Sequence, residues 1–181
     1  MAAETTFTLT ITSAGEPQTF TLGARHVESI VSGYGTDTPE FAGLFAAAAQ
    51  HPALSVRRSA AGQDNLPADA VLALANDPCA SVRVQIVGNR VFRQVATEAV
   101  VLALIESDPE VADAVANYVG QFENVDVNVL CEALSRHPDP SVRRTLANNS
   151  DCPVKWLRKF RTDPSKDVMD TAISELASRS R

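Results

Sequence analysis

Paired arginines behind a histidine and a proline occur twice in this chain, in HPALSVRRSA from His51 and in HPDPSVRRTL from His137. A guanidinium group can bind a phosphate or a carboxylate through two parallel hydrogen bonds. A repeated arginine pair could therefore hold an anionic ligand, but it could equally be a structural element or a copy left by duplication. The elements that position the pairs decide among these uses.

Other residues that could carry catalysis or bind a metal are few and scattered. The histidines are His26, His51 and His137, and the cysteines are Cys79, Cys131 and Cys152. The sequence contains no Cys-x-x-Cys or His-x-x-x-His pair, no carboxylate-rich loop, no glycine-rich phosphate loop and no Gly-x-Ser-x-Gly turn. It therefore predicts a non-enzymatic protein without a metal or cofactor.

An Asp-Pro or His-Pro pair recurs along the chain. The pairs stand at 51–52, 77–78, 108–109, 137–138 and 163–164, so that successive prolines are 26 to 31 residues apart. Self-similarity at this period is typical of a solenoid of stacked helical units.

Each unit is expected to contain one helix after the pair and one before it. Apolar residues four, eight and nine positions after the proline, such as Val56, Ala60 and Ala61, form one face of a helix. We expect the His or Asp to cap this helix and the proline to take its first position. Three of the preceding helices are expected to open on a proline: Pro39, Pro67 and Pro153. The third unit, DPEVADAVANYV, departs from the pattern, either because its register shifts or because the array bends there.

The first arginine of each pair directly follows a core valine, and Arg83 has the same position in the second unit. We expect Arg57, Arg83 and Arg143 to form a structural ladder with turn aspartates of their own or an adjacent unit. The candidate partners are Asp77, Asp108, Asp163 and Asp139. The second arginines, Arg58 and Arg144, lie off the core stripe, which leaves them free to meet a partner protein or water.

Two stretches, ANNSDCPVKWLRKFRTDP (147–164) and AAGQDNLPADAVLALANDP (60–78), resemble the bacterial leucine-rich repeat variant. That unit has Val-Arg, a small helix, Asn or a similar polar residue, a Pro-initiated helix and then Asp-Pro, and it is similar to the wider HEAT-like class. The resemblance covers roughly residues 38–176. It implies a right-handed superhelix in a bacterial protein, with some 3₁₀ layers possible. One member carries an N-terminal cysteine cluster for an iron–sulfur centre, but this chain has no cysteine before Cys79, so that cofactor is not expected.

The first 37 residues have a different pattern. In TFTLTITSAGEPQTFTL, threonine alternates with Phe7, Leu9 and Ile11, and the alternation resumes at Phe20 after a turn. Alternation of this kind predicts a β-hairpin. We expect its apolar face to lie against the first helices as a cap on the array, although an open strand edge could also pair with a second copy.

Charge is unevenly distributed along the chain, whose net charge is −6. Residues 1–50 carry −4 and residues 138–181 carry +3, the latter from nine Lys or Arg against six Asp or Glu. The basic stretch VKWLRKFRT (154–162) could bind nucleic acid. We expect its Trp156, Leu157 and Phe160 in the core instead, with Lys155, Arg158 and Lys159 on a solvated face, since these aromatic and apolar residues fall at repeat positions held by Leu, Val and Ile elsewhere.

These observations predict an all-α, right-handed α-α superhelical solenoid with a small N-terminal β-hairpin. Residues 1–37 form the hairpin and a connecting helix, and residues 38–181 form about five repeat units. The expected function is protein–protein interaction in the cytoplasm, with nucleic-acid binding through the basic C-terminal region as the alternative. No apolar run is long enough to cross a membrane, and no secretory signal is visible. The expected partner-binding residues are Arg58, Arg83, Arg144, Lys155, Arg158 and Lys159.

Overall fold

The computed structural model describes residues 6–12, 16–33 and 41–180. Most of them are helical, and the only strands among them form a two-stranded antiparallel hairpin, as the sequence predicts. The elements are β1 Phe7–Ile11, β2 Gln18–Leu22, α1 Ala24–Gly33, α2 Ala42–Ala49, α3 Leu54–Ala61, α4 Ala68–Leu74, α5 Ala80–Val87, α6 Arg90–Val95, α7 Glu98–Ser107, α8 Pro109–Asn117, α9 Val127–Ser135, α10 Pro140–Asn148, α11 Val154–Phe160 and α12 Lys166–Ser178. The helix start expected at Pro39 lies outside the described residues.

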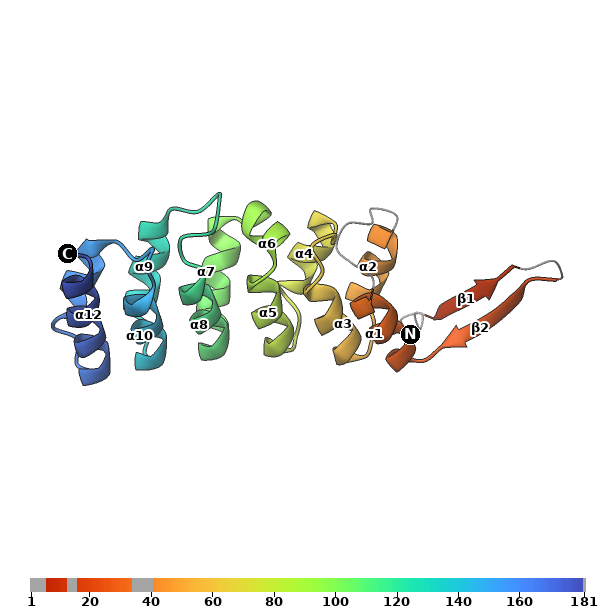
Figure 1. Ribbon diagram of the computed structural model, residues 1–181, viewed down its shortest axis with the longest axis horizontal. Helices are drawn as coiled ribbons and strands as arrows, with labels where there is room; N and C mark the ends of the chain where they lie inside the picture. The colour runs from red at the N-terminus through yellow and green to blue at the C-terminus, as the bar shows by residue number, and fades with distance from the viewer. Residues whose placement is uncertain (1–5, 13–15, 34–40, 181) are drawn as a thin grey trace.

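The helices lie side by side in two rows along the longest axis of the molecule (Figure 1). In the first row, each helix packs against the next in the order α1, α3, α5, α8, α10 and α12. The second row contains α2, α4, α6, α7, α9 and α11, of which α2 contacts α4, α4 contacts α6, and α7, α9 and α11 follow one another. Except for α6 and α7, which both belong to the second row, helices adjacent in the sequence contact each other across the rows, so that units adjacent in the sequence are also neighbours in space.

The core of the first row consists of equivalent residues in successive helices. The third residues of α3, α5, α8, α10 and α12 are all fully buried, and these are Val56, Val82, Val111, Val142 and Val168. The seventh residues are also fully buried, and these are Ala60, Ile86, Val115, Leu146 and Ala172. A spacing of four places both sets on one face of a helix. Counted from the helix start, the third unit fits the others, because its register is shifted by two residues relative to the proline pairs.

The prediction that the recurring proline begins the helix is wrong in four units. Only Pro109 is the first residue of its helix, while the helices that follow Pro52, Pro78, Pro138 and Pro164 begin two residues later. The cause is a turn made by the preceding His or Asp side chain. His51 Nδ1 accepts a hydrogen bond from the backbone N–H of Ala53 at 3.0 Å. At the turns that begin with Asp77, His137 and Asp163, the side chain likewise accepts a hydrogen bond from the backbone N–H two residues later. These side chains therefore stabilise the approach to the helix and do not cap its first turn.

The middle of the molecule contains a helix that the repeat pattern does not predict. The short helix α6 packs against α4, and its Phe92 is fully buried. The segment 118–126 folds back along α6, where Phe122 meets Phe92 edge to face at 6.2 Å and the backbone N–H of Glu123 donates to Arg93 O at 3.0 Å. This added helix and its covering segment account for the longer repeat intervals in the middle of the chain.

The hairpin projects beyond the end of the helical rows (Figure 1). Its register pairs Leu9 with Phe20, which places the apolar side chains on one face and the threonines on the other. At its base, Phe7 and Leu22 pack against the helical core. Farther out, Leu9 and Phe20 are exposed. The expectation that the apolar face lies against the first helices is thus met at the base of the hairpin alone.

Candidate partner-binding surfaces

Ion pairs tie the first-row helices together. Arg57 donates to both carboxylate oxygens of Asp77, at 2.6 and 3.2 Å, and its third nitrogen donates to the carbonyls of residues 51 and 52 at 3.0 and 2.9 Å. Arg143 repeats this arrangement with Asp163, at 2.8 and 2.9 Å, and with the carbonyls of residues 137 and 138. In both cases the aspartate belongs to the following unit. The predicted arginine ladder is confirmed at these positions.

Burial and hydrogen bonding act in opposite directions on these carboxyl groups. Burial by itself raises the pKa of Asp77, but hydrogen bonds from Arg57 and from a backbone N–H outweigh burial, so that its pKa lies below the ordinary value. The same balance lowers the pKa of Asp163 beside Arg143. The hydrogen bond to the aspartate in turn raises the pKa of each arginine. Both pairs are therefore fully charged at neutral pH.

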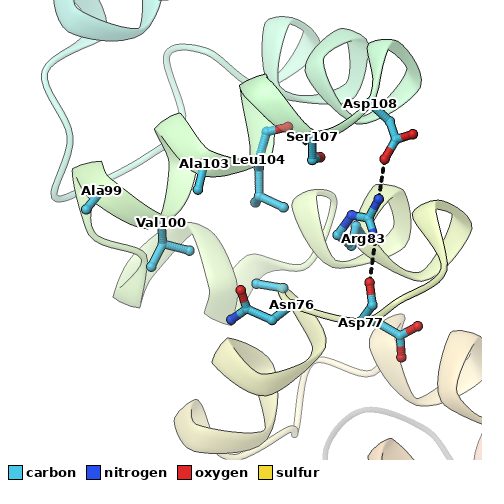
Figure 2. A pocket seen from close by; sticks show the side chains of 10 residues that line it. Asn76, Asp77, Arg83, Ala99, Val100, Ala103, Leu104, Ser107 and Asp108 are labelled. Atoms are coloured by element: carbon cyan, nitrogen blue, oxygen red, sulfur yellow. Dashed lines mark hydrogen bonds and ion pairs between the residues drawn. The ribbon is translucent and has the colours of Figure 1, made fainter.

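Arg83 takes part in the ladder with a different geometry (Figure 2). Its guanidinium donates to the carboxylate of Asp108 and to the backbone carbonyl of Asp77. Asp108 directly precedes α8 and is partly exposed, whereas the carboxylates of Asp77 and Asp163 are almost fully buried. Asp139, the further candidate partner, instead accepts from the backbone N–H of Ser141 and caps α10. The partner-binding role expected for Arg83 stays a prediction, and most of its side chain is enclosed.

A groove of about 490 Å³ lies beside Arg83. Ala99, Val100, Ala103 and Leu104 line it from α7, and the Arg83–Asp108 pair lies at one end (Figure 2). A second groove of about 620 Å³ lies between α7 and α9. It is lined by Leu102, Ile105, Glu106, Val129, Glu132, Ala133, Arg136, His137 and Pro138. Both grooves combine apolar walls with a few charged groups, which is typical of surfaces that receive a peptide or a helix.

Two asparagines tie the other end of the first-row helices, a role that was not among the expectations from the sequence. The side-chain amide of Asn89 donates to the carbonyls of Ala61 and Gln63 at 3.0 and 2.9 Å, in the preceding unit. Asn149 has the equivalent position after α10 and donates to the carbonyls of residues 116 and 117 at 2.9 and 2.8 Å. The carbonyls of Ala61, Ala116 and Asn117 lie at the ends of their helices, where no intrahelical donor is available, and Gln63 lies two residues beyond the end of α3. Recurrence of Asn nine residues after the helix start was the available signal.

The second arginines lie on the outer face of the first row. Arg58 on α3 and Arg144 on α10 are exposed and have no ion pair among the described residues. The equivalent positions on the two helices between them, α5 and α8, hold Val84 and Asp113. The two guanidinium groups are therefore separated along the row by an apolar and an acidic position.

Three basic residues lie within five positions of one another on α11. Lys155, Arg158 and Lys159 are exposed, and none of them has an ion-pair partner within the described chain. The ammonium groups of Lys155 and Lys159 lie 5.4 and 4.8 Å from the ring centroid of Trp156. Leu157 is buried as expected, whereas Trp156 is only partly buried. We call Lys155, Trp156, Arg158 and Lys159 the α11 basic face.

The six residues expected to bind a partner thus lie in both rows. Arg58, Arg83 and Arg144 belong to first-row helices, and the remaining three belong to α11 in the second row. Within residues 6–12, 16–33 and 41–180, no group of three or more His, Cys, Asp and Glu side chains is placed to hold a metal ion. Cys131 and Cys152 are buried next to each other, and their hydrogen bond raises the pKa of Cys131, as burial also does.

No family model, curated protein or solved structure matches the chain at a significant level. In the part of the chain that the structure describes, no helix is both long and apolar enough to cross a bilayer, and the longest, α12, has 13 residues.

Proposed function

We propose that the chain is a non-enzymatic protein-interaction module of the bacterial cytoplasm. In this proposal it is a right-handed α-α superhelical solenoid of about five units, similar to leucine-rich repeat variant and HEAT-like arrays. The support is the recurrence of equivalent buried positions in five first-row helices, together with Arg–Asp and Asn–carbonyl ties between neighbouring units. Such ties keep the units in fixed register, so that outward side chains form a preorganised surface.

The surface that we assign to the partner is the α11 basic face. The observation that carries the assignment is the group of three exposed cations that have no carboxylate partner among the described residues, two of them held over the ring of Trp156. The ladder arginines differ in this respect, because Arg57 and Arg143 already bind both a carboxylate and backbone carbonyls. An acidic segment of a partner protein supplies the missing counter-charges, and ammonium groups already held in place lose little freedom when they bind it.

The experiment uses Trp156, which is the only tryptophan of the chain. A ten-residue glutamate peptide is titrated at low salt while the tryptophan fluorescence is recorded. We expect a saturable change, with a dissociation constant raised at least about tenfold when Lys155→Gln and Lys159→Gln are combined, which corresponds to about 1.4 kcal/mol. The matched control is Lys166→Gln on α12, an exposed lysine outside the face, which should leave binding unchanged.

The alternative function is nucleic-acid binding, and a DNA duplex in the same titration separates the two. An acidic protein segment predicts weaker binding of the duplex than of the peptide. Tighter binding of the duplex, with a steep decrease at higher salt, would replace the proposal by a nucleic-acid interface. Failure of the peptide to change the fluorescence even at low salt would reject the α11 basic face as the binding surface.

A further inference from the structure

Two cysteines occupy core positions that hold hydrocarbon side chains in an earlier unit. Cys131 lies in α9, Cys152 directly precedes Pro153, and both cysteine side chains are fully buried. The offset of 86 residues that separates the two arginine pairs relates these cysteines to Phe45 and Leu66, which are also buried. Hydrocarbon side chains therefore fill this part of a unit without any thiol, whereas the later unit has a thiol at both positions.

The two thiols interact directly. The Cys131 thiol donates a hydrogen bond to the sulfur of Cys152, and Arg179 adds a positive charge near Cys152. Arg179 is fixed there by hydrogen bonds to the carbonyls of Cys152 and Asn149, at 2.6 and 2.8 Å. The hydrogen bond and the arginine lower the pKa of Cys152 although burial opposes them, while the hydrogen bond and burial raise the pKa of Cys131. The pair thus combines a sulfur that favours the thiolate with a protonated neighbour.

We propose that Cys131 and Cys152 form a reversible disulfide when the chain meets a peroxide. The Cys152 thiolate attacks one oxygen of hydrogen peroxide, the O–O bond breaks, and Cys152 becomes a sulfenic acid while the released hydroxide takes up the proton that Cys152 had lost. The Cys131 sulfur then attacks the Cys152 sulfur, the S–O bond breaks, and the Cys131 proton leaves with the hydroxyl group as water. Two thiols are oxidised to one disulfide, and one peroxide is reduced to two waters.

The disulfide joins two neighbouring helices of the second row. It ties α9 to the start of α11, two elements that already contact each other, and the loop that it closes contains α10. Closure of this loop restricts the unfolded chain and so stabilises the folded one. In a cytoplasm the reduced pair is the resting state, because disulfides there are transient and respond to oxidants. This inference does not depend on the partner proposed for the α11 basic face.

The experiment treats the folded full chain with an equimolar amount of hydrogen peroxide, alkylates the remaining thiols and identifies tryptic peptides by mass spectrometry. We expect the peptide that ends at Arg136, with Cys131, to be joined to the peptide that ends at Lys155, with Cys152. A thiol reductant added before alkylation should separate them. Oxidation should also lower the equilibrium constant of unfolding in urea at least about tenfold. The control is Cys79→Ser, which replaces the partly exposed third cysteine and should leave the yield of the joined peptides unchanged.

A second pair of variants tests which sulfur reacts first. Cys131→Ser keeps a hydroxyl donor beside Cys152 but cannot form the disulfide, so the Cys152 sulfenic acid should accumulate and react with dimedone. Cys152→Ser should leave Cys131 without this label. Labelling of Cys131 in place of Cys152 overturns the proposed steps. A parent protein without the joined peptides, or an oxidised chain that is less stable than the reduced one, overturns the disulfide itself, and both results are independent of the folding of the variants.

Discussion

Two junctions of the first row are nearly identical, and the junction between α8 and α10 is different. The starts of α3 and α5, and those of α10 and α12, are separated by 26 residues, whereas the starts of α8 and α10 are separated by 31. Both 26-residue junctions contain a bidentate Arg–Asp pair whose arginine also binds the two carbonyls of the preceding turn. We call the junction between α8 and α10 the middle junction. There, Ala112 stands at the position of the ladder arginine and His137 at the position of the aspartate.

The comparison shows that the ladder arginine and the aspartate that it binds are replaced together. Where the ladder arginine is absent, the following turn residue is histidine, and His137 Nδ1 still accepts the turn hydrogen bond from the backbone N–H of Asp139 at 3.2 Å. An aspartate there would be a carboxylate without its guanidinium, which is costly when buried. The middle junction instead has a hydrogen bond on its outer side, from Thr145 Oγ1 to Asp113 at 2.5 Å.

Removal of a ladder arginine is the largest expected perturbation. Arg143→Ala leaves Asp163 buried without its counter-charge and two turn carbonyls without a donor. We expect the free energy of unfolding, measured by urea denaturation, to fall by about 3–5 kcal/mol. The control is Arg136→Ala, which breaks the exposed pair with Glu132 and should cost at most about 1 kcal/mol. Equal losses in the two variants would show that the ladder pair is no stronger than a surface pair.

Removal of an asparagine tie comes next, and it acts at both kinds of junction. Asn149→Ala deprives the carbonyls of Ala116 and Asn117 of their donor and the backbone N–H of Asp151 of its acceptor. We expect a loss of about 1–3 kcal/mol in the same measurement. Its exposed neighbour Asn148 makes no comparable contact with the described part of the chain, and Asn148→Ala should change stability by no more than about 0.5 kcal/mol. Similar values for the two variants would remove the asparagine from the set of structural ties.

A double-mutant cycle tests why the middle junction lacks the ladder. Ala112→Arg and His137→Asp are each expected to destabilise the chain, because the first introduces a charge at a fully buried position and the second at a partly buried one. In combination they should recover a coupling energy of about 1 kcal/mol, measured by urea denaturation of the four proteins of the cycle. A coupling of zero would mean that the longer link holds α8 and α10 in a geometry that excludes the pair, whatever the side chains.

Repeat spacing and side-chain type together predicted much of this architecture. The two helices per unit, the buried valines, the Arg57–Asp77 and Arg143–Asp163 pairs and the hairpin strands all follow from helical or alternating periodicity. Such periodicity is a local property of the sequence, and every unit repeats it. The exposed position of Arg58 followed from the same counting, since it lies off the buried stripe.

Features that depend on one particular contact were not predictable in this way. Proline fits the first position of a helix in general, but here the His51 side chain bonds to the N–H of Ala53 and delays the helix by two residues. Likewise α6 is stabilised by Phe122 and the segment after α8, which is remote in the sequence. The hairpin was expected to cover the array, yet its two-residue periodicity gives only its own amphipathic faces and not the direction in which it projects.

Acidification should change the free energy of unfolding least among these perturbations. Protonation removes the charge of a ladder aspartate but leaves the side chain in place beside its arginine. The pKa of Asp77 and that of Asp163 lie below the ordinary value of 3.8 in the folded chain, since hydrogen bonds from arginine and backbone outweigh burial. A group whose pKa is lowered by folding contributes its stability in full above the unfolded pKa. That contribution is then lost as the pH falls through the folded pKa. We therefore expect the free energy of unfolding to be level near neutral pH and to decrease below about pH 4.

Asp77→Asn lowers the free energy of unfolding at neutral pH but should make its decrease with acid shallower. The control Asp64→Asn, at an exposed turn, should follow the curve of the parent protein. Parallel curves for the parent protein and Asp77→Asn would show that the acid-sensitive part of the stability lies outside the ladder.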